Sequence, residues 1–159
     1  MANTIETSRA GGSAASRAAF ATLSRRECEV ARLVVMGLSN RQIAERLVLA
    51  DGTVQRHIAN ILHKLELASR VELAAWVVRQ HGLAPPRAES AASPGLSVRE
   101  AQVAGLVALG LRNRGIATRL AVAEATIQRH VAHILLKLGF SSRTQIAAWL
   151  AATPGELAH

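Results

Sequence analysis

Two stretches of the chain place apolar residues at the spacing of an α-helix, and they resemble each other closely. In residues 53–65 the apolar side chains fall on one stripe, which predicts a helix packed against a core. The opposite face is short, polar and lightly basic, and side chains of this kind can donate to base edges in a DNA major groove. The stripe consists of Val54, Ile58, Ile61, Leu62 and Leu65, and the polar face of Gln55, Arg56, Ala59, Asn60 and His63. The second stretch is residues 126–138.

Start and stop signals around the first stretch predict four short helices. The first, second and fourth open on capping boxes, in which a serine caps the helix and a Glu or Gln three residues later reaches back. Gly37 predicts a left-handed end to the first helix, and residues 49–52 predict the turn into the third. No segment alternates with the period of a strand, so we expect an all-α fold. The capping boxes are Ser24–Glu27, Ser39–Gln42 and Ser69–Glu72.

The chain contains an internal duplication. A constant shift of 73 residues pairs Leu23 with Leu96 and Trp76 with Trp149, and roughly half of about sixty positions are identical without a gap. Prolines among Ala and Ser predict a linker between the copies, and the Ala- and Ser-rich N-terminus predicts a tail. We therefore expect two tandem four-helix domains. The predicted boundaries are a tail at 1–19, domain one at 20–83, a linker at 84–94, domain two at 95–153 and a tail at 154–159.

Copy two departs from copy one at its second helix and on its polar face. Arg112 and Gly115 stand where copy one has a capping box, and glycine inside a helix costs about 1 kcal/mol relative to alanine. Leu136 stands where copy one has His63. We expect copy two to be less stable and to contact DNA more weakly.

Composition and charge restrict the partners. The 159 residues are 50% hydrophobic and carry a net charge of +8, and both copies are basic, which favours an anionic partner such as nucleic acid or acidic lipid. Cys28 is the only cysteine, and the N-terminus has no apolar signal-peptide core. The longest apolar run, residues 73–78, is too short to cross a bilayer. A soluble cytoplasmic protein with no membrane partner is predicted.

Residues suited to catalysis or to metal binding do not cluster in the sequence. No nucleophile, base and oxyanion donor can be assembled, so we expect no enzyme activity. His130 and His133 have a helical spacing that could hold a metal, but no Cys or carboxylate joins them, so we expect no metal or other cofactor. With no Tyr and two Phe, binding of single strands by base stacking is poorly supported.

A helix, a tight turn and a second helix with one polar face form a helix-turn-helix, whose second helix enters the major groove. At residues 20–83 the sequence resembles the LuxR/GerE-type four-helix DNA-binding domain, and copy two resembles it over 96–151. The motifs that carry the resemblance are Leu23-Ser24-x-Arg26-Glu27, residues 37–44 (GLSNRQIA), Gly52-Thr53-Val54-x-x-His57, Asn60-Ile61-Leu62-x-Lys64-Leu65 and Ser69-Arg70. The resemblance implies a transcription regulator that dimerises through its fourth helix.

The resemblance also implies which residues contact DNA. Gln55, Arg56 and Ala59 correspond to base-facing positions, and Thr53 and Lys64 lie near phosphates. Gln55 stands where the family usually has lysine, which puts adenine within reach of a bidentate amide. Ala50 and Ala123 stand where the family has serine, so an N-cap is missing or shifted to Asp51. The predicted DNA-binding residues are Asn40, Arg41, Thr53, Gln55, Arg56, Ala59, Asn60, Lys64, Asn113, Arg114, Thr126, Gln128, Arg129, Ala132, His133 and Lys137.

The fourth helix of each copy is apolar on more than one face, which predicts self-association. A linker of about 13 residues spans up to roughly 40 Å, and half-sites one turn apart are about 34 Å apart. Both copies could thus engage one site, and we hypothesise a pseudo-dimer within one chain, with a homodimer as the alternative. The predicted interface residues are Leu73, Trp76, Val77, Ile146, Trp149 and Leu150.

The sequence therefore predicts a regulator that binds double-stranded DNA sequence-specifically, with its recognition helices in the major groove. A second hypothesis is a protein-interaction module that acts on RNA polymerase or on another regulator through the helix-four surface. A protein that captures polymerase but binds no DNA would favour the second.

Overall fold

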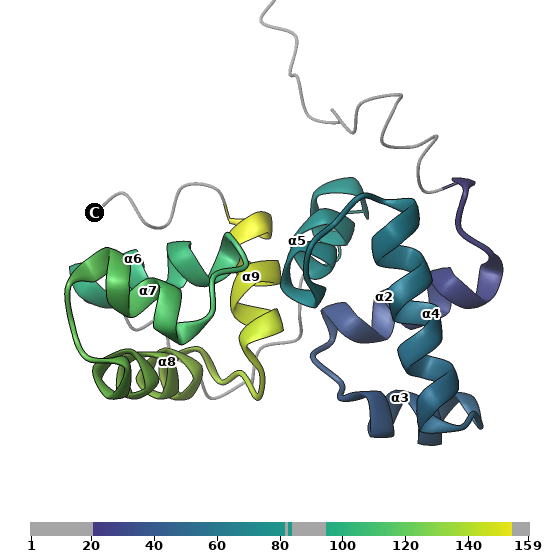
Figure 1. Cartoon of the computed structure of the whole chain (residues 1–159), viewed down its shortest axis with the longest axis horizontal. Helices are drawn as coiled ribbons and strands as arrows, with labels where there is room; N and C mark the ends of the chain where they lie inside the picture. The colour runs from purple at the N-terminus through teal and green to yellow at the C-terminus, as the bar shows by residue number, and fades with distance from the viewer. Residues whose placement is uncertain (1–20, 82, 84–94, 154–159) are drawn as a thin grey trace, which may run out of the picture.

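The computed structural model describes residues 21–81, 83 and 95–153, and this part of the chain is helical without strands. The all-α prediction with two tandem units is confirmed. Each unit contains four helices in the same order (Figure 1). Copy one comprises α2 (Arg25–Val35), α3 (Asn40–Leu47), α4 (Asp51–Lys64) and α5 (Arg70–His81). Copy two comprises α6 (Val98–Ala108), α7 (Asn113–Leu120), α8 (Glu124–Leu138) and α9 (Arg143–Ala152).

The capping boxes fix most of the helix starts. Ser24 caps α2 through a bond from the Glu27 amide, and the Glu27 carboxylate accepts from the Ser24 amide at 2.7 Å. Ser39 caps α3 and Ser97 caps α6 in the same way. At α5 the Ser69 hydroxyl accepts from the Glu72 amide at 3.2 Å, but the Glu72 carboxylate accepts from the Ala68 amide at 3.1 Å, one residue before the predicted partner. These bonds satisfy amides that a helix leaves without intrahelical partners.

The turn before α4 differs from its prediction. Asp51 and Gly52 belong to the helix, and Ala50 is an N-cap whose side chain makes no capping bond. The left-handed residue of the turn is Val48, with φ of 54°, and Ala121 has φ of 52° at the same place in copy two. The sequence concealed this turn because valine and alanine are not residues that favour the left-handed region.

Each copy has its own apolar core, filled by the inward stripe of its helices. In copy one, Val30, Ile43 and Ile61 are fully buried, and in copy two Ile116 and Ile134 are. The recognition helix of each copy therefore packs against an apolar core. The predicted tails and linker lie outside the described residues. No helix of the described part is long and apolar enough to cross a membrane.

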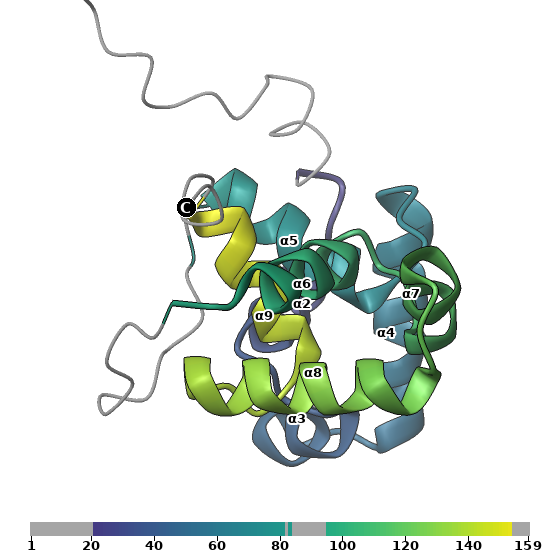
Figure 2. The same cartoon turned by 90° about the vertical axis from the view of Figure 1, so that its left-hand side faces the viewer.

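The two copies pack against each other through α5 and α9, which lie side by side in both views (Figures 1 and 2). The contact is reciprocal. A Cβ added at Gly37 would lie 2.6 Å from Gln145 Cδ, and one added at Gly110 would lie 2.7 Å from the Glu72 carboxylate. Gly37 corresponds to Gly110, and Glu72 to Gln145, under the shift of 73 residues. The copies are therefore related by an approximate two-fold axis, as in an isologous dimer.

Small residues form the centre of this contact. Val71, Ala75 and Ala147 are buried together, with Ala108 and Ala151 packed around them. Leu73, Trp76 and Val77 belong to the apolar cluster of copy one, which Ala148 and Ala151 of α9 join, and Ile146, Trp149 and Leu150 belong to the cluster of copy two. A direct role of these six residues in the interface stays a prediction. A helix that is apolar on several faces does not reveal which face covers its own core, so the small residues at this contact could not be singled out from the sequence.

Candidate nucleic-acid interface

The polar faces of α4 and α8 are open to solvent. Gln55, Arg56, Ala59 and Asn60 are exposed on α4, and their counterparts Gln128, Arg129, Ala132 and His133 are exposed on α8. Thr53 is exposed and Thr126 is half-buried. Val54 and Ile127, on the opposite faces, are fully buried and fix the rotation of each helix. The amphipathic reading of these helices is confirmed, and each presents amide and guanidinium donors outward.

The two recognition helices run in different directions. In Figure 2, α8 runs along the bottom and begins at the right, beside α7, whereas α4 runs up the right-hand side and begins at the bottom, beside α3. The N-terminal residues of a recognition helix are those that reach base edges. The N-terminal ends of α4 and α8 are therefore the candidate base-contacting ends.

Arginines secure the first helix of each helix-turn-helix. The Arg26 guanidinium donates to the Leu47 carbonyl at 2.7 Å, and Arg99 donates to the Leu120 carbonyl at 3.2 Å. These carbonyls lie at the C-terminal ends of α3 and α7, where a cation is also favoured by the helix dipole. The turn before α4 is thus hydrogen-bonded to α2, and the turn before α8 to α6.

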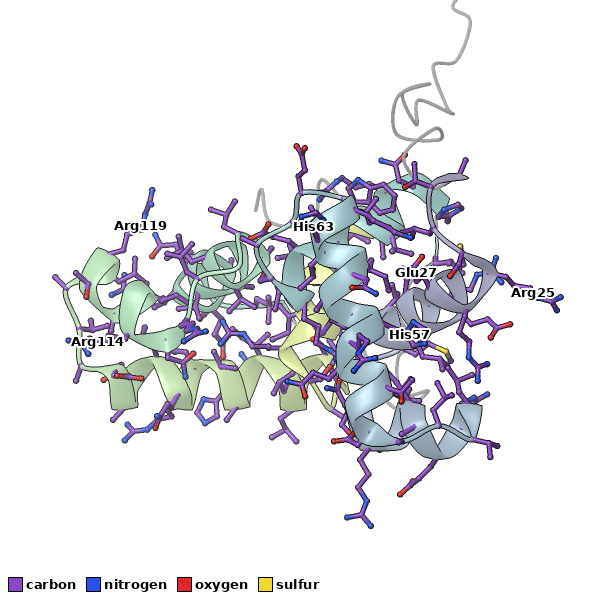
Figure 3. All side chains as sticks on the ribbon, turned by 45° about the vertical axis from the view of Figure 1, so that its right-hand side comes forward. Arg25, Glu27, His57, His63, Arg114 and Arg119 are labelled. Carbon is purple, nitrogen blue, oxygen red and sulfur yellow. The ribbon has the colours of Figure 1, made fainter. Side chains whose placement is uncertain are left out.

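Lys64 and Lys137 have partners within the protein. The Lys64 ammonium is 2.8 Å from the Glu27 carboxylate, which lies between α2 and α4 (Figure 3), and Lys137 is 2.6 Å from Glu100. Burial raises the pKa of the Glu27 carboxyl, but hydrogen bonds from Lys64 and Ser24 outweigh burial and the pKa lies below its ordinary value. Lys64 therefore links α4 to α2, and Lys137 links α8 to α6. A phosphate contact by these lysines stays a prediction.

Asn40 and Asn113 are likewise engaged internally. The Arg70 guanidinium donates to the Asn40 side chain at 2.7 Å and to the Leu38 carbonyl. Arg143 makes the equivalent bonds to Asn113 at 3.2 Å and to the Leu111 carbonyl at 2.7 Å. Burial lowers the pKa of both guanidinium groups. These asparagines are among the predicted DNA-binding residues, whereas their arginine partners have no predicted role, although the pair recurs 30 residues apart in both copies.

Arg41 and Arg114 occupy equivalent exposed positions in different surroundings. Arg41 pairs with Glu45 at 3.1 Å, whereas copy two has Thr118 in place of that glutamate. Arg114 and Arg119 project from α7 into solvent (Figure 3). A guanidinium without an acidic neighbour on its own helix is better placed to attract phosphate, so α7 is the more cationic of the two first helices.

This paired arrangement of exposed recognition helices defines a protein with two helix-turn-helix domains. The model of the luxR family of bacterial regulatory proteins matches the chain twice, at residues 21–77 and 94–150. The chain therefore belongs to the luxR family. The two matches cover the two copies found in the sequence.

Curated relatives match the chain over the length of one copy. The nitrate/nitrite response regulator protein NarL of Escherichia coli K12 is 44% identical over 55 residues, which are 35% of this chain and 26% of NarL. The transcriptional regulatory protein DegU of Brevibacillus brevis is 46% identical over 50 residues, 31% of this chain and 21% of DegU. The chain thus spans about a quarter of the length of these relatives. No solved structure matches the chain.

Proposed function

We propose that the chain regulates transcription by binding double-stranded DNA sequence-specifically, with α4 and α8 of the same molecule in two successive major grooves. The observation that carries this proposal is the reciprocal packing of α5 and α9, which sets two exposed recognition helices into one two-fold arrangement. In a dimeric helix-turn-helix regulator the same arrangement needs two chains.

The polar faces determine the kind of contact. Gln55 and Gln128 carry the carboxamide that bonds adenine N6 and N7, and Arg56 and Arg129 carry the guanidinium that bonds guanine O6 and N7. All four side chains are exposed. We propose that these residues read bases and that Thr53 and Thr126, with Arg41 and Arg114, contact the backbone.

Binding-site selection from random duplex DNA with the full chain tests this function. We expect enriched sequences with two motifs spaced by about one helical turn. Substitution of Arg56 by Ala should relax one base position and lower affinity by roughly 1–3 kcal/mol. Arg25→Ala is a matched control, because Arg25 is an exposed arginine on α2, outside the recognition helices (Figure 3). An unenriched pool, or equal losses in both variants, would contradict base reading.

The alternative of a polymerase-binding module depends on an exposed surface of helix four. Val71 and Ala75 of α5 are buried against α9, so this helix-four surface is already covered within the chain. A partner protein would have to use another face, and no observation favours one.

A further inference from the structure

The two recognition faces are held in symmetric positions but are chemically unlike. Their shared residues are the glutamine, arginine and alanine already assigned to base contact. Four other exposed positions of the two helices differ: Asp51 against Glu124, Gly52 against Ala125, Asn60 against His133 and His63 against Leu136. Because the two-fold relation maps each of these residues onto its counterpart, equivalent places on the DNA would meet different side chains.

Asn60 and His133 differ most in what they can recognise. Both are exposed and lie one turn after the arginine of their helix, about 6 Å further along the axis. The Asn60 carboxamide holds a donor and an acceptor side by side, which suits the N6 and N7 atoms of adenine. The two nitrogens of the His133 imidazole point away from each other, so one base edge meets only one of them. His133 therefore suits a single bond, such as one to guanine N7 or O6.

His63 and Leu136 extend the difference into the last turn. The His63 imidazole is exposed and can donate a hydrogen bond to a phosphate. Leu136 is 82% exposed and can make no such bond. The last turn of α4 can thus hold the backbone in a way that the last turn of α8 cannot.

We propose that the chain recognises two unlike half-sites and binds its DNA in one orientation, with Asn60 and His133 as the residues that distinguish the halves. This inference rests on the proposed DNA-binding function. A homodimer would present each reader twice and would favour a palindrome. Here the α5–α9 contact joins two different readers in one molecule, so the orientation on DNA is built into the chain.

Sequence selection with the intact chain and with two exchange variants tests the asymmetry. The wild-type protein should enrich an imperfect inverted repeat, identical where Gln and Arg read and different at one position in each half. Asn60→His should abolish the adenine preference in the first half and bring the consensus close to a perfect repeat. His133→Asn should instead create an adenine preference of roughly 5- to 150-fold in the second half. Gln102→His makes the same amide-to-imidazole exchange at an exposed residue of α6, outside the recognition helices, and should leave the consensus unchanged.

The experiment distinguishes failure of the unlike half-sites from failure of sequence-specific DNA binding. If the wild-type chain enriches no sequence, the proposed function fails. If it enriches a perfect palindrome that neither exchange alters, DNA binding stands and the inference of unlike half-sites is overturned. Enrichment of a single half-site, lost in Arg56→Ala but not in Arg129→Ala, would also overturn the inference, because only copy one would then read bases.

Discussion

The backbone conformation of Val48 is unfavourable for a residue with a β-branched side chain. It is 90% exposed and sits at φ of 54°, in the left-handed region that a β-branched residue rarely adopts. Val48→Gly should therefore raise the free energy of unfolding by about 1 kcal/mol. Urea denaturation of the full chain measures the change. Val98→Gly, at the exposed first residue of α6, should lower stability instead, and a loss in both variants would contradict the strain at Val48.

The Glu27–Lys64 pair predicts how stability depends on pH. The folded-state pKa of Glu27 lies below its ordinary value of 4.5, as does that of Glu100. The stabilisation from a lowered carboxyl pKa is fully present above the ordinary value and is lost as the pH falls through the folded-state value. Unfolding free energy should thus decline on acidification below about pH 4.5.

Removal of the lysine should change that pH profile. In Lys64→Met, burial of the Glu27 carboxyl is no longer offset by its main partner, so the loss of stability on acidification should be smaller than in the wild type. Urea titrations across this pH range compare the two proteins, with Arg46→Met as a control that removes an exposed cation outside the pair. An acid profile unchanged in Lys64→Met would show that this pair does not set it.

At the scale of the helix, the recognition helices lack a capping side chain. Ala50 and Ala123 are the N-caps of α4 and α8, and neither makes a side-chain capping bond. Ala50→Ser and Ala123→Ser should each stabilise the protein by about 1 kcal/mol. Thermal or urea unfolding measures this, and Ala59→Ser on the same helix is a control with no cap to form. No gain in either cap variant would contradict the assigned helix starts.

Helix α7 carries the local weakness predicted from sequence. Its N-cap Arg112 makes no side-chain capping bond, and a Cβ added at Gly115 would make only ordinary contact, 3.8 Å from the Leu111 side chain. Gly115→Ala should therefore stabilise copy two by about 1 kcal/mol, because alanine restricts the unfolded chain without a clash. Hydrogen exchange along α7 locates the effect. A destabilised variant would mean that the glycine has a packing role.

The elements of this fold were predictable because their signals are local. Ser24 and Ser39 open helices as their capping boxes indicated, and Gly37 ends α2 with φ of 84°. The left-handed Val48 was missed because it is set by the packing of α3 and α4 and not by its own preference. The predicted base-reading positions are exposed as expected, but Asn40 and Lys64 bond to residues distant in sequence, which a helical pattern does not reveal.

At the scale of the whole molecule, two features disfavour a side chain at Gly37, beside the α5–α9 contact. Its positive φ disfavours any side chain, and Gln145 of the other copy occupies the space of a Cβ. Gly37→Ala should destabilise the protein, and the further substitution Gln145→Ala should recover the part due to the clash while the backbone strain of roughly 1–2 kcal/mol remains. Urea denaturation of both single variants and the double variant gives the coupling. Strictly additive losses would contradict the packing of Gly37 on Gln145.

We propose that one chain places two recognition helices on one duplex. Protection of guanine N7 from methylation by dimethyl sulfate tests it directly, since N7 lies in the major groove. On a duplex chosen by selection, with one chain bound per duplex, two protected segments about one helical turn apart are predicted, and Arg56→Ala and Arg129→Ala should each expose one of them. Protection of a single segment, or two segments only when two chains are bound, would contradict the account.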